Sequence, residues 1–91
     1  MTEKELYEKT INIVGKDVFD KIFEKCRKRE VVYLRVIFTK FYRECGLLIC
    51  DVGKKLNTDH ATIGHYIKMY DINYEYSKDF RNLADGILKD E

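Results

Sequence analysis

The stretch KKLNTDHATIGHYIKMYD (residues 54–71) decides the fold, because it contains both a turn and the start of a helix. Asn57 and Thr58 predict a tight turn, and Asp59 stands where an N-cap residue accepts a backbone hydrogen bond. Behind this cap, Ile63 and Ile67 are expected to pack on the core. The stretch also holds two histidines and two threonines, which a purely core-filling helix does not need. It therefore predicts two helices joined by a short turn, the second opening with hydrogen-bonding side chains.

The rest of the chain predicts further helices. Thr2 and Glu5 form a capping box for a first helix that stops near Gly15. A long helix from about residue 30 to 44, ended by Gly46, is predicted by the apolar repeat of Val32, Val36, Ile37, Phe41 and Cys45. The others are a short helix capped by Asp17, one from residue 48 or 49 to 56, one after Asp59, and one from about 74 to 89 that presents Tyr76, Phe80, Leu83, Ala84 and Leu88 to the body. The fold class is all-α: one compact domain over residues 1–91, with about six helices including a helix-turn-helix.

Composition places the chain among soluble globular proteins. Of its 91 residues, 45% are hydrophobic and 36% are charged. No apolar run is long enough for a membrane span, and the first ten residues lack the apolar core of a secretion signal, which predicts a cytoplasmic protein without membrane contact. Cys26, Cys45 and Cys50 form no CxxC pair, so we expect reduced and mostly buried thiols.

Positive charge is concentrated in the middle of the chain. Residues 25–68 contain ten Lys or Arg against four Asp or Glu, whereas both flanking segments carry net negative charge. The basic run KCRKRE (residues 25–30) stands at the start of this middle segment. A basic patch between acidic ends is typical of a surface that binds a polyanion, although a solvated helix face produces a similar run.

Catalytic, metal and cofactor sites are not predicted. VGKD (residues 14–17) and VGKK (residues 52–55) lack the Ser or Thr of a phosphate-binding loop. His60 and His65 are five residues apart on one helix, which splays their rings, and no paired cysteines complete a zinc site. We therefore expect no enzyme and no cofactor.

A major-groove contact would explain the opening stretch. If the helix after Asp59 enters a groove with its N-terminal end first, its leading side chains can bind base edges and phosphates. Small residues at Ala61 and Gly64 would permit a close approach, and a methyl group of Ala61 or Thr62 could contact a thymine.

TDHATIGHYIK (residues 58–68) resembles the signature of domain IV, the C-terminal DNA-binding domain of the bacterial chromosomal replication initiator DnaA. RKREVVYLR (residues 27–35) is similar to the basic loop and long helix of that family, CDVGKKL (residues 50–56) to the first helix of its helix-turn-helix, and DFRNL (residues 79–83) to its final helix. The resemblance spans nearly the whole chain. It implies double-stranded DNA as the partner, at a short asymmetric site resembling a replication-initiator box, bound by one copy of the domain.

The resemblance also implies the contact residues. Major-groove contacts fall on Asp59, His60, Ala61 and Thr62, with His65 as the second signature histidine, and a minor-groove contact falls on Arg27. The remaining implied DNA-binding positions are Lys28, Arg29, Arg35, Lys54, Thr58 and Lys68. Because the 91 residues hold no nucleotide-binding domain, neither ATP hydrolysis nor origin melting is expected of the chain itself.

Two functions from different classes remain. The first is a sequence-preferring DNA-binding module of a stand-alone replication or regulatory protein, such as a phage or mobile element could encode. The second is a protein-interaction module or adaptor that keeps the fold and docks on replication proteins. Thr58 and Met69 favour the second, because basic residues are usual there in the family. In that case His60 would be merely solvated and His65 a hydrogen-bonded core residue.

Overall fold

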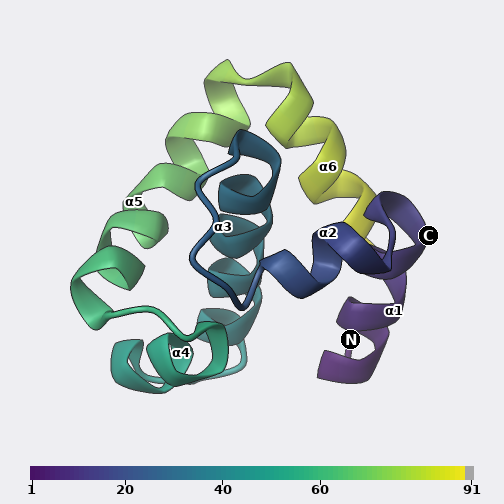
Figure 1. Ribbon diagram of the computed structural model, residues 1–91. Coiled ribbons are helices and arrows are strands. Elements are labelled where there is room, and N and C mark those ends of the chain that lie inside the picture. Colours follow the sequence, from purple (N-terminus) through teal and green to yellow (C-terminus); the bar gives the residue numbers. More distant parts are fainter. Residues whose placement is uncertain (90–91) are drawn as a thin grey trace.

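Six α-helices and their connections form residues 1–89, the part of the chain that the computed structural model describes (Figure 1). Their bounds are α1 Glu3–Val14, α2 Lys16–Lys21, α3 Arg29–Glu44, α4 Ile49–Leu56, α5 His60–Tyr76 and α6 Lys78–Leu88. The described residues contain no strand. The prediction of an all-α domain is therefore confirmed.

Helix α3 is the centre of the domain. Leu34, Ile37 and Phe38 on one face and Val36 on the opposite face are all 0% exposed, so α3 is buried on more than one side. In Figure 1, α5 lies on one side of α3, while α1, α2 and α6 lie on the other. Helix α4 packs against both α3 and α5 at the lower end, so α3 carries the α4–α5 pair on one flank.

Two helix starts differ from the sequence prediction. Gly15, with φ of 89°, is the N-cap of α2, and Asp17 lies in the first turn instead of capping it. Helix α5 continues to Tyr76, and Ser77 caps α6 by accepting a hydrogen bond from the Phe80 backbone N–H at 3.2 Å. Tyr76 is 80% exposed, so its predicted place on the inner face of the last helix is wrong.

Some predicted core positions are exposed. Cys45 and Cys50 are exposed and Cys26 is half-buried, so the expectation of mostly buried thiols is wrong. Cys45 follows the last turn of α3 and Cys50 lies in the first turn of α4, so both exposed thiols lie at helix ends. Ile63 is 0% exposed as expected, but Ile67 is 36% exposed, and the buried residues of α5 are Ile63 and Tyr66. In residues 1–89, no helix combines the length and apolarity that crossing a bilayer requires.

Candidate nucleic-acid interface

The turn between α4 and α5 occupies residues 57–59. Asn57 adopts the left-handed conformation with φ of 54°, which Asn tolerates better than most residues. The backbone N–H of Thr58 then donates to the Gly53 carbonyl at 2.8 Å. This bond folds the turn back onto α4 and fixes where α5 begins.

Gly53 makes this close approach possible. A Cβ atom at Gly53 would lie 2.6 Å from the backbone oxygen of Thr58, closer than real contacts allow. The obstructing atom is a backbone oxygen of the turn, so it cannot move aside as the end of a flexible side chain could. Gly64 on α5 differs, since a Cβ there would meet nothing within 4 Å.

We expect Gly53→Ala to lower the free energy of unfolding by about 1–2 kcal/mol, because the added methyl pushes the turn off α4. Gly64→Ala is the matched control. It should raise the free energy of unfolding by about 0.5–1 kcal/mol, because alanine is the better helix former in an open position. Urea unfolding of both variants measures these changes. A Gly53→Ala variant that is as stable as the wild type, or that is stabilised as Gly64→Ala is, would show that the turn does not pack as described.

Asp59 caps α5 as predicted from the sequence. Its Oδ1 accepts a hydrogen bond from the Thr62 backbone N–H at 2.8 Å. This bond to the Thr62 backbone, and in second place the interaction with the Thr62 side chain, lower the pKa of the Asp59 carboxyl below its ordinary value. His60 and Ala61 are exposed at the start of the helix, and Thr62 is half-buried.

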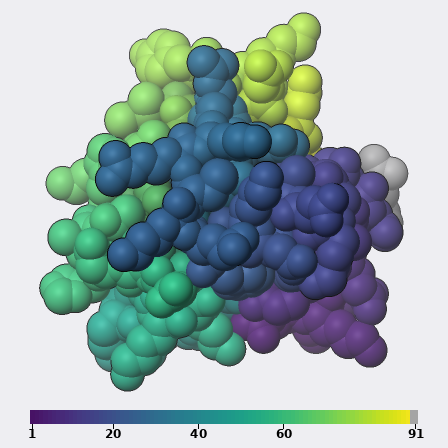
Figure 2. Space-filling model, in the orientation of Figure 1, coloured from purple at the N-terminus to yellow at the C-terminus, as the bar shows by residue number. Residues whose placement is uncertain are grey.

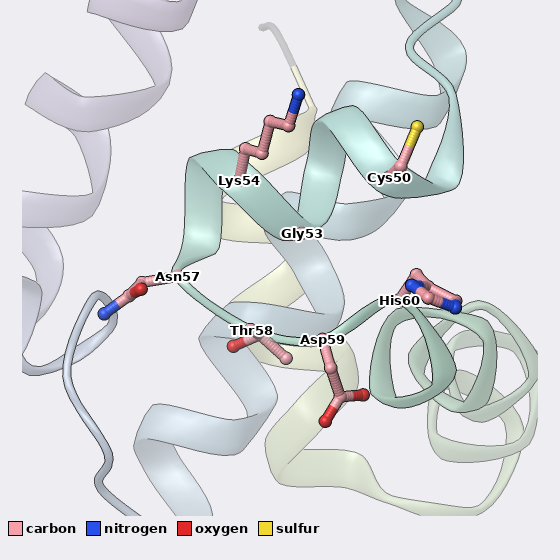
Figure 3. Close-up of a pocket in the computed structure, with 7 residues that line it drawn as sticks. All are labelled: Cys50, Gly53, Lys54, Asn57, Thr58, Asp59 and His60. Atoms are coloured by element: carbon pink, nitrogen blue, oxygen red, sulfur yellow. The ribbon is translucent and has the colours of Figure 1, made fainter.

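An open groove of about 450 Å³ lies over the turn, between α4 and the start of α5. Figure 3 shows its lining: Lys54 and Cys50 project from α4 on one side of the turn, and Asp59 points to the other side. His60 stands at the first turn of α5. A basic side chain and a histidine thus border the same open surface.

We expect Asp59→Ala to lower the thermal unfolding midpoint, because it removes the cap of α5, and to weaken DNA binding too if the surface predicted from the sequence binds DNA. Ser77→Ala, which removes the cap of α6, is the matched control and should lower the midpoint only. The lowered pKa gives a pH dependence: the stabilisation by Asp59 is complete above its unfolded pKa and is lost as the pH falls through the folded pKa. Thermal scans of wild type and Asp59→Ala across acidic pH should therefore converge, and persistent separation would contradict this role.

The loop between α2 and α3 lies beside the start of α5. A second groove of about 380 Å³ is bordered by Lys25 and Arg27 from the loop and by Thr58, Asp59 and Thr62 from the turn and α5. Figure 2 shows side chains of the blue segment between α2 and α3 projecting on this face towards green α5. The basic run and the α5 signature, some thirty residues apart in sequence, therefore form one surface.

The cations on this surface have no carboxylate partners. Within residues 1–89, none of these side chains takes part in an ion pair with Asp or Glu, and all are exposed: Lys25, Arg27, Lys28, Arg29, Lys54 and Lys68. By contrast, Lys16 and Lys55 are paired, with Asp20 at 2.7 Å and Glu3 at 3.2 Å. Unpaired cations keep their positive potential available to an anionic ligand.

Arg35 requires a correction. It was expected near phosphates, but only 6% of the residue is exposed. Its guanidinium donates to backbone carbonyls of the preceding segment, including those of Ile22 at 2.8 Å and Cys26 at 2.9 Å. Arg35 lies at the wall of the second groove, but its guanidinium donors are engaged by the protein backbone, so it is not counted among the cations open to a ligand. The sequence alone did not distinguish Arg35 from the exposed arginines of the basic run.

His65 and Lys68 lie further along α5. Both are exposed, so the alternative of His65 as a core residue is wrong. With Ala61 they are spaced as i, i+4 and i+7, which places all three on one outward stripe of the helix. None of the three residues lines either of the two grooves. Lys25 and Asn57 line the second groove, although sequence analysis named them only in the basic run and in the turn and not among the contact residues.

Comparisons with protein-family models, curated proteins and solved structures found no match to this chain. Within residues 1–89, no group of three or more His, Cys, Asp or Glu side chains is arranged to hold a metal ion. The arrangement described above is a basic, grooved face built from a loop, a tight turn and a helix N-terminus.

Proposed function

We propose that this protein binds double-stranded DNA with sequence preference, using α4 and α5 as a helix-turn-helix and the loop between α2 and α3 as a second contact. One observation carries the proposal: unpaired loop cations and the capped start of α5 border a single groove. The loop and the helix can thus engage neighbouring grooves of one duplex at the same time.

The start of α5 suits the major groove. An α-helix fits there, and residues at its N-terminal end contact base edges. His60 and Thr62 offer hydrogen-bonding groups, Ala61 offers a methyl group, and Asp59 fixes the helix start that presents them. Lys54 on α4 is exposed beside this end and suits a backbone phosphate.

The loop suits the adjacent minor groove. Arg27 is exposed and unpaired within residues 1–89, and it borders the groove that leads to α5. A narrow minor groove concentrates negative potential and attracts an inserted arginine. Lys28 and Arg29 follow at the start of α3, where they can contact phosphates on either side.

The resemblance to the DNA-binding domain of the replication initiator narrows the target. It suggests a short asymmetric duplex related to a replication-initiator box, bound by one copy without ATP hydrolysis. The test is fluorescence anisotropy with a labelled duplex containing such a box and with a scrambled duplex of equal composition. Tighter binding to the box supports the proposal. Absence of binding to either duplex at low salt would overturn it.

We expect Arg27→Ala to weaken binding more on duplexes with A/T-rich flanks than on G/C-rich flanks, by about tenfold on the former. Lys4→Ala on α1 removes the same charge outside the proposed surface and should have little effect. Anisotropy titrations on both flank types measure the difference. Equal losses on the two duplexes would reduce Arg27 to a general phosphate contact.

A protein partner is the second candidate. Ile72 is 57% exposed and Tyr76 80% exposed, one helical turn apart on the C-terminal half of α5. Exposed apolar side chains at this spacing suit contact with another protein. If the protein binds neither duplex in the anisotropy experiment, a protein partner becomes the better proposal.

A further inference from the structure

Arg35 binds the loop that carries Arg27. It projects from the second turn of α3, and its side chain uses all three guanidinium nitrogens. Nε donates to the Ile22 carbonyl and Nη1 to the Cys26 carbonyl. Nη2 donates to the carbonyls of Lys21, at 3.3 Å, and Glu24. One buried cation thus holds four backbone groups of residues 21–26.

The acceptors explain why a charge is tolerated there. Helix α2 ends at Lys21, and the last carbonyls of a helix have no partner within the helix. Backbone N–H groups of the segment already donate to two of the carbonyls, Glu24 to Lys21 at 3.1 Å and Cys26 to Glu24 at 2.9 Å. Arg35 adds a second bond to each while also binding the carbonyls of Ile22 and Cys26. A guanidinium has five N–H donors in a fixed plane, so it can satisfy several carbonyls at once, which a lysine ammonium does less well.

The loop is also tied to the turn before α5. Asn57 Nδ2 donates to the Phe23 carbonyl at 3.4 Å. Figure 3 shows the Asn57 side chain pointing at the neighbouring loop and away from the other labelled side chains. Arg35 therefore fixes the loop to α3, and Asn57 links the same loop to the α4–α5 turn. Arg27 directly follows Cys26, whose carbonyl Arg35 holds.

We propose that Arg35 is a positioning residue that fixes the loop relative to α5, so that Arg27 and the start of α5 engage DNA as one rigid unit. This inference rests on the proposed DNA-binding function. An ordered loop loses little conformational entropy on binding, whereas a loosened loop must be ordered at the expense of affinity. Arg35 acts on the ligand through Arg27 and does not itself contact DNA.

Loop mobility can be measured without DNA. The exposed Cys45 and Cys50 are first replaced by serine, which leaves Cys26 as the single thiol. Because Cys26 is half-buried in the held loop, we expect Arg35→Lys to speed its reaction with a thiol reagent about tenfold, as charge-assisted hydrogen bonds are lost. An unchanged rate in a folded Arg35→Lys protein would overturn the inference.

DNA binding is then measured as a double-mutant cycle. Arg27→Ala is made in the wild-type and in the Arg35→Lys background, with His60→Ala as the matched comparison in both. If Arg35 positions the loop, the fold loss from Arg27→Ala shrinks several-fold in the Arg35→Lys background, while the fold loss from His60→Ala is unchanged. A merely destabilising effect would not act on Arg27 selectively, so equal losses in both backgrounds overturn the inference.

A second variant covers the case in which Arg35→Lys fails to fold. Asn57→Gly removes the side-chain bond to the Phe23 carbonyl and keeps the positive φ, because glycine accepts that conformation freely. It should raise Cys26 reactivity and reduce the loss from Arg27→Ala in the same direction. If the wild type binds no DNA, the proposed function fails and the role in binding falls with it, while the thiol rates still decide whether Arg35 holds the loop.

Discussion

Raising the salt concentration from about 50 to about 200 mM is expected to weaken DNA binding about 150- to 500-fold, if four or five phosphates are neutralised. Each neutralised phosphate releases condensed counterions, so the logarithm of the binding constant falls with the logarithm of salt with a slope near −4. The cations available for these contacts are Lys25, Arg27, Lys28, Arg29, Lys54 and Lys68, all exposed and without carboxylate partners within residues 1–89. Arg35 is excluded because its donors are used inside the protein.

Single substitutions show how much each cation contributes to this slope. We expect Lys28→Ala to reduce its magnitude by about one, because one phosphate contact is lost. Lys16→Ala is the control, since Lys16 is paired with Asp20 on α2 and lies outside the proposed surface. Anisotropy titrations at several salt concentrations give the slopes directly. A wild-type slope near zero would contradict DNA binding through this face.

Local sequence signals predicted the elements that frame the site. Asp59 caps α5 because an aspartate there satisfies a free backbone N–H, which depends only on neighbouring residues. Gly46, with φ of 93°, follows the end of α3 for a similarly local reason. The bounds of α3 followed from the helical spacing of its apolar residues and are confirmed to within one residue, and the predicted helix from residue 48 or 49 to 56 is confirmed as α4. Whether the face binds DNA stays a prediction.

The features that sequence analysis missed depend on contacts between segments distant in the chain. In the sequence Arg35 looks like the exposed arginines of the basic run. It is buried only because α3 packs beneath the preceding loop. The last helix was expected from about residue 74, but the break between α5 and α6 lies at Ser77, where no glycine or proline marks the place. Gly53 is required by a backbone oxygen five residues later, which becomes apparent once the turn is folded.

His60 is expected to supply the largest single contribution to sequence preference. It is exposed at the first position of α5, beside Lys54 and the groove over the turn. A good side-chain contact to a base is worth about 1–3 kcal/mol of discrimination, so His60→Ala should reduce the ratio of affinities for the preferred and scrambled duplexes about 5- to 150-fold. Since the side chain is exposed, thermal stability should stay nearly unchanged.

Paired titrations of His60→Ala against both duplexes measure this ratio, and circular dichroism checks that the variant is folded. Asn82→Ala, an exposed polar substitution on α6, is the control and should keep the wild-type ratio. Most of the loss should fall on the preferred duplex, because phosphate contacts by the loop and Lys54 are retained on any sequence. If His60→Ala weakens binding to both duplexes equally, the histidine contacts only the DNA backbone, and sequence preference must come from Ala61, Thr62 or the shape of the groove.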